Sequence, residues 1–100
     1  MENQDNHQLN IELSEEVAQG IYSNLAIISH SSSEFVLDFV RLMPGTPKAK
    51  VKSRIILTPE HAKRLMHALQ DNIAKYEQQM GPIKQQAPQI PPMGFSQGEA

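Results

Sequence analysis

Residues 50–62, KVKSRIILTPEHA, decide the fold, because a strand pattern passes directly into a helix start within this stretch. From 50 to 57, the side chains alternate with a period of two, which is typical of a half-buried β-strand. Thr58 then offers a hydroxyl that accepts a hydrogen bond as a helix N-cap, and Pro59 suits the first helical position because an N–H there would have no partner. A strand followed at once by a helix predicts a fold that mixes α and β elements.

The sequence after this stretch predicts one long amphipathic helix over 59–80. Gly81 and Pro82 end it, since glycine favours the position after a helix and proline cannot continue one. At about 1.5 Å per residue the helix is about 33 Å long, longer than a strand of about nine residues. We therefore expect its distal part to overhang the sheet and to contact another subunit. The predicted oligomer contacts are Leu69, Ile73, Tyr76 and Met80.

The clearest strand before residue 50 is predicted at 34–42, where Phe35, Leu37 and Phe39 alternate with more polar neighbours. The apolar stretch 21–29 runs into a histidine and three serines, which are typical of a turn. Together the two stretches predict a β-hairpin. Between 42 and 50, two prolines and a glycine predict an exposed loop that no central strand passes through.

The segment before residue 21 allows two interpretations. Residues 8–13 alternate between apolar and polar side chains, which indicates a short strand. A competing interpretation makes Ser14 the cap of a helix that extends to Ile28, but Gly20 and the β-branched residues near its end argue against that length. A short turn of helix near 15–19 remains an alternative.

The predicted fold is an α+β domain with an antiparallel meander of three to four strands, followed by one long amphipathic helix on one face, most simply as a dimer. The strands are expected at about 8–13, 21–29, 34–42 and 50–57. Residues 1–8 are expected to be a disordered leader, 9–81 a single domain, and the Pro- and Gln-rich residues 82–100 a disordered tail. The predicted core consists of Leu25, Ile27, Phe35, Leu37, Phe39, Val51, Ile55, Leu57, Leu65, Leu69, Ile73 and Tyr76.

Composition narrows the class of protein. The chain has 100 residues, 39% of them apolar, and no cysteine or tryptophan, which excludes disulfide scaffolds and thiolate chemistry. The first residues have no signal-peptide pattern and no apolar run is long enough to span a membrane, so we expect a cytoplasmic protein without a membrane partner. A chain this short buries a limited share of its surface, so a homo-oligomer, most simply a dimer, is expected.

Charge is distributed unevenly along the chain. The first forty residues contain seven acidic residues and no Lys or Arg, whereas 41–64 contain seven basic residues and one acidic residue. The candidate basic patch consists of Arg41, Lys50, Lys52, Arg54, Lys63 and Arg64. We favour mutual neutralisation across the sheet over a phosphate-binding surface, because the pI is near 6.0 and no aromatic residue lies among these cations.

No motif indicates catalysis. His61 and His67 are six positions apart, which does not bring both rings to one metal ion as a spacing of four does. No phosphate-binding glycine loop and no nucleophile elbow occur in the sequence. We therefore expect no catalytic residue, no metal ligand and no cofactor.

Four stretches of the chain resemble a family of small bacterial and archaeal proteins known as domain of unknown function 3467. The resemblance covers about residues 11–82 and implies no activity, so no site residue is carried over. The order of strands followed by a long helix is also similar to the export chaperone SecB, although a second long C-terminal helix is missing here. The four stretches are Tyr22-Ser23-Asn24, Ile28-Ser29-His30-Ser31, Glu34-Phe35-Val36-Leu37-Asp38-Phe39 and Arg54-Ile55-Ile56-Leu57-Thr58-Pro59-Glu60-His61-Ala62-Lys63.

These observations favour a small homo-oligomeric interaction or adaptor protein without catalytic activity, whose protein partner the sequence does not identify. Two other functions stay open. One is a nucleic-acid-binding protein that uses the basic strand, which is less favoured. The other is a SecB-like chaperone that binds unfolded chains, which requires an exposed apolar groove.

Overall fold

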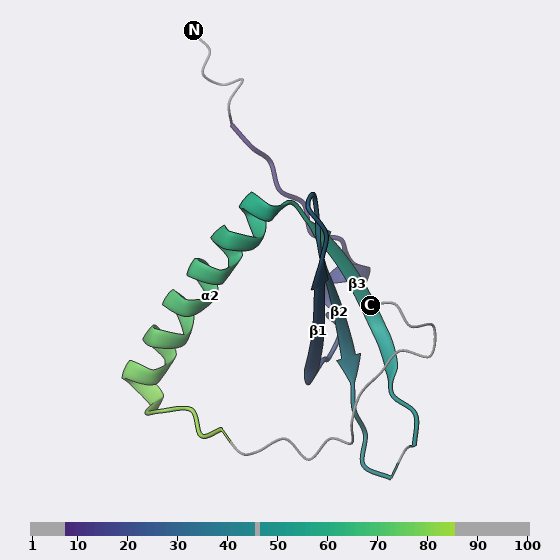
Figure 1. Ribbon diagram of the computed structural model, residues 1–100. Coiled ribbons are helices and arrows are strands. Elements are labelled where there is room, and N and C mark those ends of the chain that lie inside the picture. The colour runs from purple at the N-terminus through teal and green to yellow at the C-terminus, as the bar shows by residue number, and fades with distance from the viewer. Residues whose placement is uncertain (1–7, 46, 86–100) are drawn as a thin grey trace, which may run out of the picture.

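The computed structural model describes residues 8–45 and 47–85, and these form a three-stranded antiparallel sheet followed by a long helix (Figure 1). The leader and most of the tail expected at the two ends lie outside the described residues. The α+β class and the meander order are confirmed. The elements, in chain order, are α1 (Glu15–Ala18), β1 (Leu25–His30), β2 (Phe35–Arg41), β3 (Lys50–Leu57) and α2 (Pro59–Met80).

The predicted hairpin joins β1 to β2, and its turn is held by serine. His30 lies opposite Phe35, and the backbone N–H of Ser31 donates to the carbonyl oxygen of Glu34 at 2.9 Å. The Ser31 hydroxyl also accepts hydrogen bonds from the N–H groups of Ser33 and Glu34, both at 3.2 Å. A side chain that binds the turn backbone in this way explains why a serine run follows the first strand.

β2 is the central strand and pairs with β3 through a register shift. Phe39 lies opposite Ser53, but the next residue, Val40, lies opposite Val51. Lys52 is therefore an extra residue in β3, as in a β-bulge, which bends and twists a strand locally. The loop predicted between these strands is present, with a positive φ of 78° at Gly45.

The strand predicted at 8–13 is wrong, because these residues form no ladder with any described strand. Alternation makes a strand only where a neighbour pairs with its backbone. The short-helix alternative is confirmed by α1, which is capped by the Ser14 hydroxyl at 3.2 Å from the N–H of Val17. The longer helix to Ile28 is wrong, since α1 gives way to Gly20 with a φ of 79°.

β1 begins at Leu25 rather than at the predicted residue 21. The two residues before it bind the end of β2 through their side chains and through the backbone N–H of Asn24, which donates to the Val40 carbonyl at 3.1 Å. The Leu42 N–H donates to the side-chain oxygen of Asn24 at 2.7 Å, and the Ser23 hydroxyl donates to the Val40 carbonyl at 3.0 Å. These side-chain bonds fix where the chain enters the sheet.

α2 has the bounds and the caps that the sequence predicts. The Thr58 hydroxyl accepts a hydrogen bond from the N–H of His61 at 3.2 Å, and Pro59 occupies the first turn. At the other end Gly81 has a φ of 91°, and its N–H donates to the carbonyl of Glu77 at 2.9 Å. Both ends of the helix are therefore specified by local chemistry.

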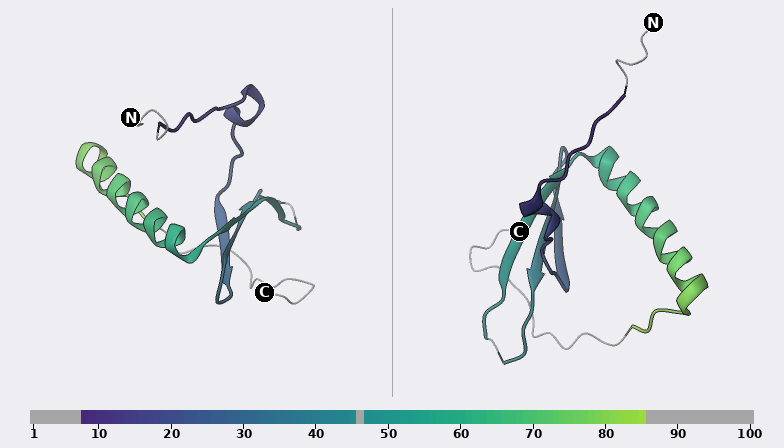
Figure 2. Two further views of the ribbon diagram at one scale, coloured as in Figure 1. Left: turned by 90° about the horizontal axis from the view of Figure 1, so that it is seen from above. Right: turned by 180° about the vertical axis from the view of Figure 1, so that it is seen from behind.

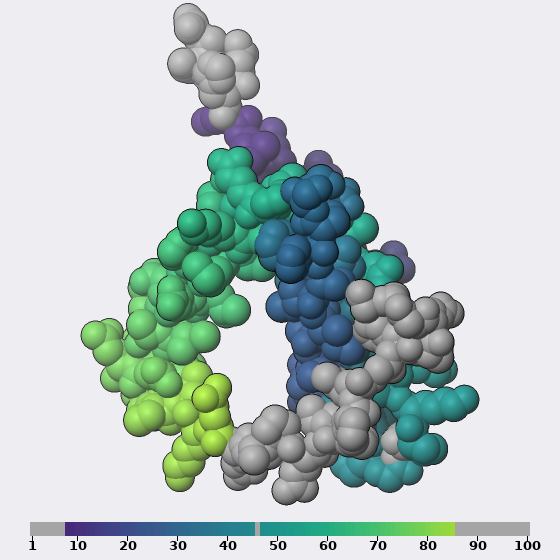
Figure 3. Space-filling model, in the orientation of Figure 1, coloured from purple at the N-terminus to yellow at the C-terminus, as the bar shows by residue number. Residues whose placement is uncertain are grey.

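The helix does not pack along the sheet, and this overturns most of the predicted core. α2 leaves β3 at its first turn and diverges from the strands, so that open space separates the two in the space-filling view (Figures 1 and 3). None of its residues is buried. Of the predicted core only Leu57 is buried, together with Val40 and Asp38, which were assigned to the polar face. The exposed members of the predicted core are Val51, Ile55, Leu65, Leu69, Ile73 and Tyr76, and the half-buried ones are Leu25, Ile27, Phe35, Leu37 and Phe39.

Candidate functional site

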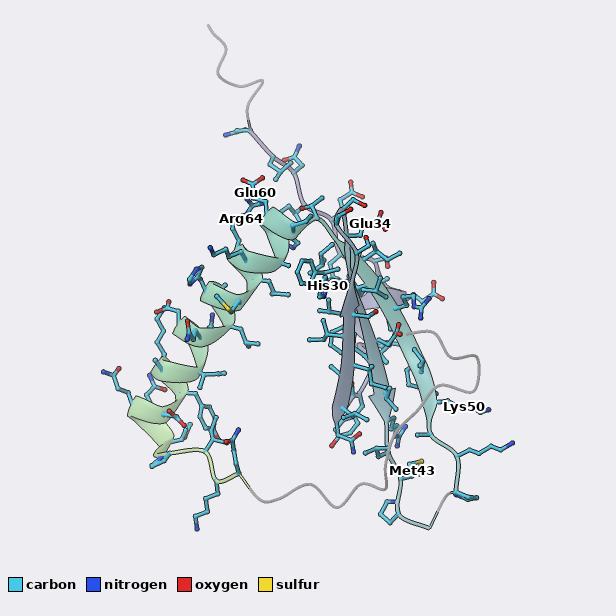
Figure 4. All side chains as sticks on the ribbon, in the orientation of Figure 1. His30, Glu34, Met43, Lys50, Glu60 and Arg64 are labelled. Atoms are coloured by element: carbon cyan, nitrogen blue, oxygen red, sulfur yellow. The ribbon has the colours of Figure 1, made fainter. Side chains whose placement is uncertain are left out.

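One face of the sheet is turned toward α2. His30 points to the side of the sheet on which α2 lies (Figure 4), and its ring stacks on Phe35 with centroids 5.3 Å apart. Because side chains alternate along a strand and directly paired residues share a face, the register assigns the rest of this face. Its members are Ala26, Ile28, His30, Phe35, Leu37, Phe39, Ser53, Ile55 and Leu57, followed at one end of the sheet by Arg41 with Lys50 opposite it. Apart from that end, this face contains no Asp, Glu, Lys or Arg.

The apolar stripe of α2 lies on the same side of the helix as Ala62, which is in the first turn of the helix, beside the sheet. Ala62 is half-buried where the helix leaves β3, and at 100° per residue Leu69, Ile73 and Met80 share its side. Among these large apolar residues, Ile73 is 39% exposed and Leu69 57%. The stripe is therefore an apolar surface that the described residues leave largely uncovered.

We call the space between these two surfaces the α2–sheet groove. Its helix wall is Leu65, Leu69, Ile73 and Tyr76, and its sheet wall is Ile28, Phe35, Leu37, Phe39 and Ile55. Figure 3 shows that side chains do not close it. A contiguous apolar surface of this extent is typical of a protein interaction site.

The opposite face of the sheet contains a buried ion pair that neutralises part of the basic strand. Asp38 on β2 lies opposite Arg54 on β3 and is 2% exposed. The Arg54 Nε donates to one carboxylate oxygen at 2.6 Å and Nη2 donates to the other at 2.9 Å. Such a two-pronged arrangement is the strongest geometry for this pair. The cross-strand pairing expected between these charges is thus present.

The pKa of Asp38 is lowered by this partner. The hydrogen bonds from Arg54 are the main cause, burial acts in the opposite direction by favouring the neutral acid, and the positive charge of Arg54 adds to the lowering. The carboxylate is therefore ionised at neutral pH although it is buried.

This shift predicts an acid-sensitive stability. Because the pKa is lower in the folded chain, the pair contributes its full stability above the unfolded value, near pH 4, and loses it as the pH falls through the folded pKa. Urea denaturation at a series of pH values is expected to show this loss for the natural chain. Asp38→Asn should be less stable at neutral pH and should lose less on acidification; parallel profiles would contradict the assignment.

The six residues of the candidate basic patch do not lie together. Arg41 and Lys50 face each other at one end of the sheet, whereas Lys63 and Arg64 follow the other end of β3, about 23 Å away along the strand. Figure 4 shows Lys50 and Arg64 at opposite ends. Arg64 pairs with Glu60 at 3.0 Å.

The rest of the patch is divided between other contacts. The Arg41 guanidinium lies 5.7 Å from the ring centre of Tyr22, Arg54 binds Asp38, and Lys52 is the extra residue in β3. Sequence reasoning expected the acidic residues of the hairpin to pair with Lys50, Lys52 or Arg54 across the sheet, but it did not single out Arg54 as the partner of Asp38 or predict that the carboxylate is buried. The apolar residues that flank Asp38 and Arg54 along their strands were the feature of the sequence from which this burial could have been predicted.

Within residues 8–45 and 47–85, no three His, Asp or Glu side chains are grouped closely enough to hold a metal ion. Over the same residues no helix has the length and hydropathy needed to cross a membrane.

Comparison with known proteins gives one match. A family described as a protein of unknown function, DUF3467, matches residues 1–85, which include every helix and strand described above. No curated protein and no solved structure matches the chain. The topological similarity to SecB is therefore not shown.

Proposed function

This chain belongs to the DUF3467 family of proteins of unknown function, and we propose that it is a small non-catalytic interaction protein that works as a homodimer. In this dimer, α2 of each copy occupies the α2–sheet groove of the other. The observation that carries the proposal is the position of α2, a 22-residue helix that buries none of its residues within its own chain.

A helix in this position needs a partner. In water, the stability of a protein helix comes mainly from packing of its apolar face rather than from intrinsic propensity. The apolar wall of α2 has little such packing in one chain. Burying the exposed half of a Leu or Ile side chain contributes about 1 kcal/mol, so four such residues from each copy supply several kcal/mol toward association.

A second copy fits this groove better than an unrelated chain does. Twofold symmetry brings the same surface of both molecules together, so the surface must be complementary to itself. The two apolar walls meet this condition, since the charged residues of the sheet face, Arg41 and Lys50, lie at one end of the sheet and not among the wall residues. Association of two copies would bury the apolar stripes of both α2 helices at once.

The non-catalytic part of the proposal has separate support. Catalytic groups usually have shifted pKa values because burial and neighbouring charges tune them. Asp38 is a buried carboxylate with a lowered pKa, but both of its carboxylate oxygens already accept hydrogen bonds from Arg54.

The test of the dimer combines mass with helix content. We expect sedimentation equilibrium of the full chain to give the mass of a dimer at micromolar concentration. On dilution, the helical signal in far-UV circular dichroism should fall in step with dissociation, because α2 loses its packing. A monomer whose helical signal is independent of concentration would contradict the proposal.

The two alternative functions have narrower support. For nucleic acid, the favourable observation is that Arg41 lies directly opposite Lys50, since facing like charges are stabilised by an anionic ligand. Against it, Arg54 and Arg64 already bind carboxylates. A SecB-like chaperone would use the same groove for an unfolded chain, and this function requires that a second copy does not fill it.

A further inference from the structure

Residues 8–14 form an extended arm that stands away from the sheet. In the view from above, this purple segment and α1 lie well apart from the strands (Figure 2). Leu9, Ile11 and Leu13 are 81%, 84% and 70% exposed. These three side chains alternate with Asn10 and Glu12, so an extended arm presents an apolar face and a polar face.

The arm has the pattern of a strand but lacks a strand to pair with. In residues 8–45 and 47–85, no backbone hydrogen bond connects 9–13 to another segment. An isolated strand is not stable in water, whereas addition to a sheet edge satisfies its backbone and buries alternate side chains. The arm's apolar residues recur with a period of two, which suits pairing with the edge of a sheet and does not suit a groove between helices.

The outer edge of β3 is the complementary surface. β3 pairs only through its inner side with β2 over the described chain, so its outer N–H and C=O groups face solvent. Lys50, Lys52 and Arg54 give this strand a positive charge, while the other edge strand, β1, has no Lys, Arg, Asp or Glu. The arm and α1 contain three acidic residues, Glu12, Glu15 and Glu16, and no basic residue.

We propose that residues 9–13 of one copy add as a fourth strand to the outer edge of β3 in a second copy. This inference rests on the dimer proposed above. Leu9, Ile11 and Leu13 would extend the sheet face that contains Ile55, and Glu12 would lie on the face of Arg54. Each arm leaves its own sheet at β1, the strand farthest from its own β3, which favours pairing with the neighbour.

Lysines on an edge strand have another common role, which is to prevent edge-to-edge aggregation. The two roles of the lysines predict different effects of charge reversal on association. If the lysines only protect the edge, Lys52→Glu acts independently of the arm. If the arm binds there, Glu12→Lys and Lys52→Glu should each weaken association by about two- to fivefold, and the double variant should recover most of the loss.

Cross-linking tests the pairing directly, because the chain has no cysteine of its own. Tagged chain with Ile11→Cys is mixed with untagged chain carrying either Ser53→Cys or Ile55→Cys, and the mixture is oxidised. We expect disulfide-linked pairs of tagged and untagged chains with at least one of the two. Ala26→Cys is the matched control, since it lies on the same sheet face but on the β1 edge.

The possible results separate this inference from the dimer itself. Cross-linking to residue 53 or 55 between copies, with little to residue 26, supports it. Equal cross-linking to residue 26, or cross-linking within one chain of an Ile11→Cys and Ser53→Cys double variant, overturns it. A dimer by sedimentation without cross-links to β3 overturns the arm pairing alone, whereas a monomer overturns the proposed function as well.

Discussion

Replacing Arg54 by Met is expected to lower the free energy of unfolding by about 2–3 kcal/mol. The substitution keeps an unbranched apolar stem but leaves the buried Asp38 carboxylate without its two hydrogen bonds from the guanidinium. Removing one member of a buried ion pair commonly costs about 3–5 kcal/mol. The Arg54 side chain is 61% exposed, so water reaches this site and the expected loss lies at or below the lower end of that range.

Urea denaturation at neutral pH and fixed protein concentration measures this effect. Lys52→Met is the matched control. It removes a positive charge from the same strand, and the described residues show no ion pair for Lys52. We expect this control to change stability by less than about 1 kcal/mol, as for most exposed residues. Equal losses for the two variants would show that the Asp38 carboxylate does not depend on Arg54.

Replacing Leu69 by Glu is expected to weaken dimerisation by about 100-fold or more. The new carboxylate would be placed on the helix wall of the α2–sheet groove, among apolar side chains that cannot pair with it. Burying an unpaired charge is costly enough that the dimer would separate instead. A factor of 100 in the dissociation constant corresponds to about 2.7 kcal/mol.

His67→Glu is the control for this helix substitution, because residue 67 lies about 200° around the helix from residue 69. It introduces the same charge on the side away from the groove and should leave the dissociation constant within a few-fold of the natural value. Sedimentation equilibrium of both variants gives the comparison. If Leu69→Glu and the natural chain associate equally well, α2 is not part of the dimer interface.

The local elements were predictable from the sequence because their signals lie within a few residues. Thr58 and Pro59 start α2, and Gly81 ends it, since caps depend on backbone groups one to four positions away. The serines after His30 give the turn between β1 and β2 for the same reason. Neutralisation across the sheet was also predictable, because opposite charges on neighbouring strands attract, although the sequence left Lys50, Lys52 and Arg54 as equal candidates.

The core was predicted poorly because it depends on where the helix lies. Periodicity shows that Leu65 and Leu69 share a face, but not whether that face meets the sheet of the same chain. Val40 was assigned to the polar face together with Asp38, yet both are buried. The sheet has apolar residues on both faces, so alternation alone did not distinguish inside from outside.

In the N-terminal segment, too, the local pattern was visible in the sequence but its pairing was not. Residues 9–13 alternate between apolar and polar side chains, but the strand that this pattern predicts exists only when another backbone supplies hydrogen bonds, and none in the described chain does so.

From the sequence alone came the order of the three strands and the long helix, and both ends of α2, because caps and turns follow from interactions between neighbours along the chain. Only the tertiary structure decided that α2 diverges from the sheet, that Asp38 is buried with Arg54, and that the basic residues separate to opposite ends of β3. These features depend on which distant segments meet, and burial is a property of the assembled surface rather than of any single stretch.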